Sequence, residues 1–139
     1  MGGAIYNYNA TVNIKADDGN IVLFDGNRAT ENEASSDIYN AQTVNLEAKD
    51  ETSSITFNGN IGNDGNAIGT INISSLNKGT INFNGKVSYQ NITLDNGTLA
   101  LGLATAGETN YLDTVKLTLN GGTLELGKNA SGITNDYFK

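Results

Sequence analysis

Apolar and polar residues alternate in short groups along the chain. Val12-Asn13-Ile14 is the first such triplet, and four similar triplets follow it. Because successive side chains of a β-strand point to opposite faces, the outer two residues of a triplet share one face and the middle residue takes the other. The pattern predicts a short strand at residues 12–14, 44–46, 71–73, 92–94 and 117–119.

A second apolar stretch follows each triplet and ends at a glycine-containing turn. In the first three copies it reads NIVLFDGN, SITFNGN and TINFNGK, with Gly26, Gly59 and Gly85 two residues after the Phe. In the last two copies, Gly102 and Gly127 directly follow a Leu. Glycine tolerates positive φ, and Asn and Asp favour turns. Each of these glycines is therefore predicted to form a corner where the chain leaves the strand.

The two strands form a unit that recurs about five times. Successive triplets begin 32, 27, 21 and 25 residues apart, which is a period typical of stacked repeats. A propeller blade needs about 40 residues and a leucine-rich repeat needs a helical segment, whereas each unit here has two strands and space for a third short one. The sequence predicts an all-β fold, a right-handed parallel β-helix (β-solenoid) of about five rungs, with residues 1–139 as a single domain.

Stacking the units aligns their side chains into columns. The predicted inward columns are Val12, Val44, Ile71, Ile92 and Leu117; Ile14, Leu46, Ile73, Leu94 and Leu119; Val22, Ile55, Ile81, Leu99 and Leu124; and Phe24, Phe57, Phe83, Leu101 and Leu126. The predicted outward columns are Asn13, Asn45, Asn72, Thr93 and Thr118, and Leu23, Thr56, Asn82, Ala100 and Glu125. Stacked aromatic rings and aligned amides favour such ladders.

Composition narrows the range of partners. The chain carries a net charge of −7 and contains no Cys and no His. Nucleic-acid binding relies on clustered Lys and Arg, so we expect no nucleic-acid partner. The absence of Cys excludes disulfides, thiolate metal sites and thiol nucleophiles.

The N-terminus lacks the pattern of a signal peptide, and no apolar run is long enough to predict a transmembrane helix. Met1 stands directly before Gly2-Gly3-Ala4-Ile5. This arrangement is typical of a start residue placed before an interior segment. We therefore expect residues 1–139 to be a β-helix fragment of a longer surface protein.

Several short motifs resemble those of a known family. Gly2-Gly3-Ala4-Ile5, Phe24-Asp25-Gly26-Asn27 and Phe57-Asn58-Gly59-Asn60 resemble the GGA(I/L/V) and FxxN motifs of the chlamydial polymorphic outer-membrane proteins. The segment LTLNGGTLELG, residues 117–127, is similar to the β-helical passenger repeats of autotransporter adhesins. The resemblance spans nearly the whole chain, although Phe83-Asn84-Gly85-Lys86 departs from FxxN at its last position. Residues 1–139 do not include the translocator barrel of that family, as we expect of a fragment.

The resemblance implies a function as well as a fold. Such passengers are displayed at the bacterial outer membrane, on the cell surface or in secreted form. They act in adhesion and virulence, with a structural stalk that carries the binding residues. The implied partner of this chain is a host-cell surface protein or a matrix component.

The alternative function is a carbohydrate-active β-helix enzyme, either a polysaccharide lyase or a hydrolase. Such chemistry needs converging carboxylates, or a base beside an acid or Ca²⁺. The chain has no His and a single Arg, and its acidic residues fall mostly at corners. We therefore expect no enzyme activity.

The mixed outward columns are also too irregular for the lattice match of an ice-binding solenoid.

Two acidic turns raise the question of calcium. They read ADDGN at residues 16–20 and GNDGN at residues 62–66. Neither turn has the spacing of an EF-hand loop or of a calcium-binding β-roll repeat. Turn-forming Asp and Asn explain both stretches, so the sequence predicts neither a metal site nor a cofactor.

Two polar segments, residues 28–42 and 103–114, are longer than a corner requires. Because loops on a rigid scaffold carry most binding residues, recognition is predicted there. The candidate contact residues are Arg28, Glu33, Asp37, Glu108, Tyr111 and Asp113.

The tyrosines divide into structural and exposed candidates. Tyr6 and Tyr39 share a repeated Ile-Tyr-Asn phrase and are predicted to be structural, whereas Tyr89 is predicted to be exposed between strands.

The ends of a cut solenoid carry unpaired strand edges. We therefore also expect end-to-end self-association, moderated by the negative charge.

Overall fold

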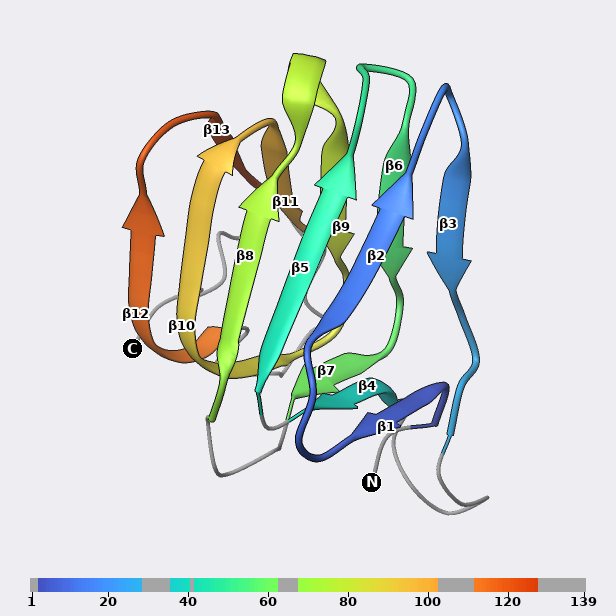
Figure 1. Ribbon diagram of the computed structural model, residues 1–139, viewed down its shortest axis with the longest axis vertical. Coiled ribbons are helices and arrows are strands. Elements are labelled where there is room, and N and C mark those ends of the chain that lie inside the picture. The colour runs from blue at the N-terminus through green and yellow to red at the C-terminus, as the bar shows by residue number, and fades with distance from the viewer. Residues whose placement is uncertain (1–2, 29–35, 41, 63–67, 103–111, 128–139) are drawn as a thin grey trace.

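The protein is built from strands that run parallel to their neighbours. The computed structural model describes residues 3–28, 36–40, 42–62, 68–102 and 112–127. Within these residues every strand pair is parallel, and one short 3₁₀ turn, η1 (Leu76–Lys78), interrupts the strands. The predicted all-β class is confirmed, and the parallel strands in two sheets are consistent with a β-solenoid (Figure 1).

One sheet has five strands in the order β13-β11-β9-β6-β3. Each strand is four residues long and follows one of the predicted triplets. Their bounds are β3 (Ile21–Phe24), β6 (Ser54–Phe57), β9 (Thr80–Phe83), β11 (Thr98–Leu101) and β13 (Thr123–Leu126).

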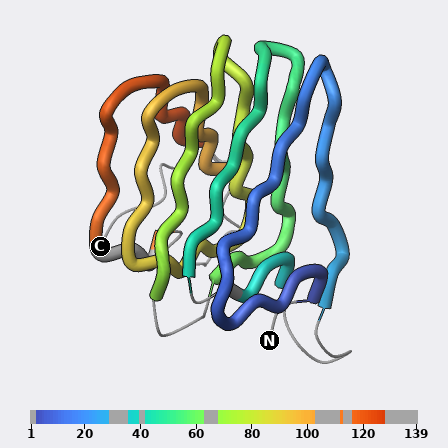
Figure 2. The backbone as a smooth tube through the Cα atoms, viewed as in Figure 1, coloured from blue at the N-terminus to red at the C-terminus, as the bar shows by residue number. Residues whose placement is uncertain are grey.

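The other sheet has eight strands, which form two ladders that meet at one long strand. The first ladder contains β2 (Val12–Ala16), β5 (Thr43–Ala48), β8 (Thr70–Ser74), β10 (Val87–Asn96) and β12 (Leu112–Leu119). The second contains β1 (Ile5–Asn7), β4 (Ser36–Asn40) and β7 (Asn60–Gly62) and joins the first half of β10. Figure 2 follows the backbone from β2 and β3 at one end to β12 and β13 at the other.

The strand register confirms the predicted columns. Val12 pairs with Val44, Val44 with Ile71, Ile71 with Ile92, and Ile92 with Leu117. The other predicted columns pair in the same way in both sheets. A slip of one residue would turn each apolar side chain to the solvent face, so the alternating pattern fixes the register.

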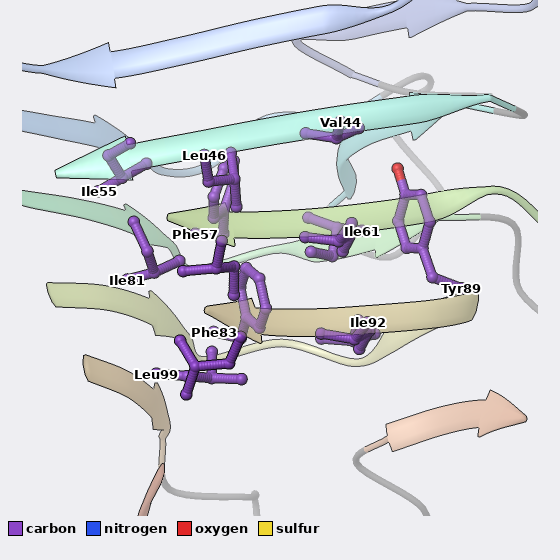
Figure 3. Packing of buried hydrophobic residues seen from close by; sticks show 14 of the residues in the cluster. Val44, Leu46, Ile55, Phe57, Ile61, Ile81, Phe83, Tyr89, Ile92 and Leu99 are labelled. Atoms are coloured by element: carbon purple, nitrogen blue, oxygen red, sulfur yellow. The ribbon is translucent and has the colours of Figure 1, made fainter. Parts of the chain in front are cut away.

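The apolar columns of the two sheets meet in one core. Side chains such as Leu46 and Ile55, from different sheets, point into the same interior (Figure 3). The ring of Phe57 stacks on that of Phe24, with centroids 4.8 Å apart, and lies 5.7 Å from that of Phe83. This stack continues the ladder through three neighbouring strands.

A further apolar column was not predicted. Ile5, Ile38 and Ile61 pair in register, and Val87 and Leu112 extend the column. Its strands are as short as three residues, and β4 lies within the segment that the sequence analysis treated as a loop. The prediction of a loop at residues 28–42 is therefore wrong for β4, and the predicted loop at 103–114 overlaps the start of β12.

The corner glycines have two different roles. Gly26 has a positive φ of 67°, whereas Gly85 does not have a positive φ. A Cβ on Gly85 would overlap the carbonyl oxygen of Gly59 in the neighbouring turn. The backbones approach closely at this corner, so what Gly85 supplies is space. The remaining corner glycines, Gly59, Gly102 and Gly127, have no positive φ either.

The tyrosines also depart in part from expectation. Tyr6 and Tyr39 form the expected structural pair, with stacked rings 5.2 Å apart. The prediction that Tyr89 is exposed is wrong, because its side chain is 0% exposed. Val87 and Tyr89 both point inward from β10, and the ring of Tyr89 lies in the core beside Ile61 and Ile92 (Figure 3).

Candidate functional site

One edge of the five-stranded sheet gathers the features that could bind a partner. Because β3, β6, β9, β11 and β13 are parallel neighbours, their carboxyl ends lie along the same edge (Figure 1). We call this the loop edge; it comprises the residues that directly follow these five strands. Both long polar segments begin here, one after β3 and the other after β11.

A hydrogen-bonded ladder of polar side chains runs along the loop edge. Asn58 Nδ2 donates to Asp25 Oδ1 at 3.1 Å, and Asn84 Nδ2 donates to Asn58 Oδ1 at 2.7 Å. All three side chains are exposed. The carboxamide oxygen of Asn84 lies against Gly102, where a side chain would leave it no room. The ladder therefore ends with an acceptor oxygen that faces the next turn.

A hollow of ≈ 440 Å³ lies at this end of the ladder, with Asn84 in its lining. It is lined by Asn84, Ala100, Leu101, Gly102, Glu125, Leu126 and Gly127. Glu125 is exposed and adds a carboxylate to the amide oxygen of Asn84. Hydroxyl and ammonium groups donate hydrogen bonds to such acceptors. The hollow is suited to a ligand with these donors and an apolar side.

This ladder and this hollow were not predicted from the sequence. The sequence feature that could have predicted the ladder is the polar residue between Phe and Gly. This residue is Asp25, Asn58 or Asn84 in the three successive copies. These residues were predicted only to form turns. Because the copies stack in register, the same positions form a continuous polar row.

Asp37 has a structural role rather than an exposed one. Its side chain is 0% exposed, and its two oxygens accept hydrogen bonds from Asn27 Nδ2 at 2.8 Å and from the Gly59 N–H at 2.7 Å. These bonds tie β4 to two turns of the loop edge. The burial of this side chain is at odds with the prediction that Asp37 contacts a partner.

The other predicted contact residues are placed as follows. Arg28 is exposed at the loop edge, four residues after the end of β3. Asp113 lies in β12, where its backbone pairs with Ser88, but its side chain is outside the described residues. Glu33, Glu108 and Tyr111 also lie outside the described residues.

A second polar row lies on the outer face of the eight-stranded sheet. Asn45 Nδ2 donates to Asn13 Oδ1 at 2.8 Å, and Asn72 Nδ2 donates to Asn45 Oδ1 at 2.9 Å. The predicted outward Asn column is thus a hydrogen-bonded ladder. Beside it, Lys15 pairs with Glu47 at 2.7 Å, and this contact raises the pKa of Lys15. None of the residues in this row lines the hollow at the loop edge.

The acidic turn at residues 16–20 is held by protein groups. Asp50 Oδ2 accepts a hydrogen bond from the Gly19 N–H at 3.0 Å, and its Oδ1 accepts from the Thr52 hydroxyl at 2.7 Å and from the Thr52 N–H at 3.0 Å. The Thr52 hydroxyl is the main cause that lowers the pKa of Asp50 to about 2. Within the described part of the chain, no group of three or more acidic, His or Cys residues could hold a metal ion.

Comparison with known proteins adds no relative, since no family model, curated protein or solved structure matches the chain. In the residues that the structure describes, no helix has the length and hydropathy needed to cross a bilayer. Functional inference therefore rests on the geometry of the loop edge and on the motifs in the sequence.

Proposed function

We propose that the chain is a right-handed parallel β-helix of about five rungs that acts as an autotransporter passenger. In this proposal it is displayed at the bacterial outer membrane, on the cell surface or in secreted form, and it mediates adhesion to host cells or matrix. The parallel, in-register strands and the short motifs at the corners support this reading. The sheets serve as a rigid stalk and catalyse no reaction.

The observation that carries the proposal is the common origin of the two long segments at the loop edge. The two long segments begin after β3 and β11, strands of one rigid sheet. They therefore start beside the Asp25–Asn58–Asn84 ladder and the hollow at Glu125. Loops held on a rigid scaffold are where binding residues concentrate. We assign partner contact to this edge and to the two long segments that begin at it, with Arg28, Glu33, Glu108, Tyr111 and Asp113 as the proposed contact residues.

The adhesion proposal predicts that loop removal lowers binding while the fold stays intact. Residues 29–35 and 103–111 are replaced by short Gly/Asn corners, so that β4 and β12 are kept. Binding of the labelled chain to cultured host cells and to immobilised matrix protein is then measured by fluorescence, and circular dichroism checks the β structure. The variant should bind at least about tenfold more weakly, because hot-spot contacts are lost.

A matched control lies at the opposite edge of the sheet. Leu76→Asn alters an exposed side chain of η1 between β8 and β9 and should leave binding unchanged. Equal binding by the loop-deleted variant would contradict the assignment to the loop edge. Cleavage of an acidic polysaccharide by the intact chain would instead favour the carbohydrate-active enzyme, for which the carboxylate of Glu125 in the hollow is the one supporting observation.

We also propose that end-to-end self-association is weak. Stacking one copy on another in register would continue the column of Leu23, Thr56, Asn82, Ala100 and Glu125. It would place the carboxylate of Glu125 on the aliphatic side chain of Leu23. The two ends are thus poorly matched in this sheet, and like net charges oppose close approach.

A further inference from the structure

Four Asn-Gly pairs lie at the ends of strands. They are Asn58-Gly59, Asn84-Gly85, Asn96-Gly97 and Asn120-Gly121. In such a pair the glycine nitrogen can attack the side-chain carbonyl carbon of the asparagine, because no Cβ on the glycine blocks the approach. The attack needs an asparagine side chain that is free to turn toward this nitrogen. It also needs a nitrogen whose N–H is not held in another hydrogen bond.

Three of the four asparagine side chains are held by neighbouring turns. Asn58 and Asn84 belong to the ladder along the loop edge, and Asn120 Nδ2 donates to Asp95 Oδ1 at 2.8 Å. The side chain of Asn96 is exposed and makes no hydrogen bond with any residue that the structure describes. A held amide must first break its hydrogen bond, which lowers its reactive population by about tenfold.

The backbone N–H groups divide the four pairs in a second way. The Gly59 N–H donates to Asp37 Oδ2 at 2.7 Å, and the Gly121 N–H donates to a carbonyl of β10 at 3.3 Å. The N–H groups of Gly85 and Gly97 have no acceptor within the described part of the chain. Of the four pairs, therefore, only the one at Gly97 combines an N–H and an asparagine side chain that no described residue holds.

The main chain before this pair is also irregular. β10 pairs with β8 without a gap up to Leu94, but the next paired residue is Asn96, so Asp95 is an extra residue in the ladder. Such a bulge leaves one residue unpaired and disrupts the ladder locally. Attack on the side chain requires the main chain at Asn96 to rotate, and fewer ladder hydrogen bonds oppose this rotation. The turn concerned joins β10 to β11 (Figure 1).

We propose that Asn96-Gly97 is a self-modification site, at which the chain converts asparagine to aspartate or isoaspartate with water as the co-reactant. The Gly97 nitrogen loses its proton to solvent and forms a bond to Cγ of Asn96. The Cγ–Nδ2 bond then breaks, and Nδ2 takes a proton from solvent and leaves as ammonia. The product of these steps is a cyclic imide. The modification does not depend on the proposed adhesion function.

Water opens the imide at either of its two carbonyls. Opening at Cγ gives aspartate and restores the original main chain. Opening at the main-chain carbonyl gives isoaspartate, in which the main chain runs through Cβ and Cγ and is one atom longer. The former main-chain carbonyl of residue 96 then becomes a free carboxylate.

The isoaspartate product would disturb a crowded corner. The carbonyl of Asn96 accepts a hydrogen bond from the Ser75 N–H at 3.3 Å, and that of Gly97 accepts from the Thr123 N–H at 2.8 Å. A Cβ on Gly97 would overlap the side chain of Ser75, which is 0% exposed. A longer main chain displaces both carbonyls where there is no space for the shift. The isoaspartate form is therefore less stable, whereas the aspartate form only adds charge to an exposed side chain.

Peptide mapping by mass spectrometry tests the choice of site. The folded chain is incubated at mildly alkaline pH and digested, and each Asn-Gly peptide is scored for replacement of the amide NH₂ by OH. Asn96 should react about tenfold or more faster than Asn58 and Asn120. In urea all four pairs should react at similar rates, because no tertiary contact then holds them. Equal rates in the folded chain, or faster reaction at another pair, would overturn the proposal.

The Asn96→Gln variant tests the chemistry. Glutamine keeps an exposed amide, but attack on its carbonyl carbon closes a larger ring, so this position should stay unmodified while Asn96 of the unaltered chain reacts. The rate at Asn96 should also rise with pH, because the attacking nitrogen must lose its proton. A rate that does not change with pH, or equal modification of the glutamine, would exclude attack by the Gly97 nitrogen.

Thermal unfolding tests the consequence for the fold. After incubation, the unaltered chain should melt about 3 °C or more below the fresh chain, to the extent that isoaspartate has formed. The retention time of the peptide distinguishes isoaspartate from aspartate. Asn96→Gln incubated in the same way, and fresh Asn96→Asp, should melt close to the fresh unaltered chain. A chain rich in isoaspartate that melts at the original temperature would overturn the assigned effect on the corner.

Discussion

At the scale of single residues, the polar groups divide into satisfied and unsatisfied ones. Asp37 is buried, and both of its carboxylate oxygens accept hydrogen bonds. Tyr89 is equally buried, but its hydroxyl has no hydrogen-bond partner, and burial raises the pKa of the phenol. A buried hydroxyl without a partner loses its hydration and gains nothing in return. The buried hydroxyl of Tyr89 therefore lowers the stability of the folded state, although the core around it is apolar.

The unpartnered hydroxyl of Tyr89 leads to a stability prediction. Tyr89→Phe keeps the ring and removes the hydroxyl, so the free energy of unfolding should rise by about 1–3 kcal/mol. Urea denaturation of the purified chain measures this change. Tyr8→Phe is the control, because the side chain of Tyr8 is 68% exposed and its hydroxyl is open to water. A less stable Tyr89→Phe variant would show that the hydroxyl has a stabilising partner.

The turn that contains Asp50 leads to a pH prediction. The Thr52 hydroxyl and neighbouring N–H groups stabilise the carboxylate and lower its pKa to about 2. A lowered folded-state pKa means that this stabilisation is present above the ordinary pKa near 4 and is lost as the pH falls toward 2. Asp50→Asn should therefore be less stable than the unaltered chain at pH 7.

The difference between Asp50→Asn and the unaltered chain should narrow as the pH falls from about 4 to about 2. Thermal unfolding across this range is the measurement. Thr52→Val, which removes the hydroxyl donor, should show the same direction of change. A difference between Asp50→Asn and the unaltered chain that is constant over this range would contradict the assigned hydrogen bonds.

At the scale of elements, the stacking of equivalent corners determines whether a corner glycine can be replaced by a residue with a side chain. Gly26 has a φ of 67° and open space around its missing Cβ. Gly85 has no positive φ, but the Gly59 carbonyl occupies the space of its missing Cβ. The two glycines occupy the same position of the FxG phrase in different copies. The neighbouring strand makes the difference, since Gly26 is in the edge copy.

These two glycines give a matched pair of substitutions. Gly26→Asn should lower the free energy of unfolding by less than about 1 kcal/mol, because Asn tolerates the left-handed region and its Cβ meets no neighbouring atom. Gly85→Asn should lower the free energy of unfolding by about 1–3 kcal/mol or more, because the new Cβ would overlap the backbone of the neighbouring turn, which must then shift. Chemical denaturation of both variants tests the contrast. A larger loss for Gly26→Asn would indicate that conformation, and not space, dominates at the corners.

At the scale of the whole molecule, the two ends of the sheets are unlike. The β3 end shows aliphatic residues on its outer face, whereas the β13 end shows Glu125 beside the hollow. Interior strands pair on both sides and present mixed polar columns between these ends. The proposed partner contact lies at the loop edge, and the interior rows serve mainly to hold that edge rigid.

The sequence by itself determined the class of the fold and the register of its main strands. The alternation of apolar and polar residues assigns each side chain to a face, and a slip of one residue would expose an entire apolar column. For this reason columns such as Val12, Val44 and Ile71 could be predicted from spacing alone. The polar columns followed from the same alternation.

Only the tertiary structure decided which residues outside these columns are buried, paired or open. The second ladder has strands too short to show a period, so Ile38 and Tyr89 were not recognised as core. The carboxylate of Asp37 turned inward because two distant groups, Asn27 and the Gly59 N–H, come together around it. The hollow at Glu125 likewise depends on which strands are neighbours. Such features arise from contacts between segments far apart in the chain, and local sequence patterns do not encode those distances.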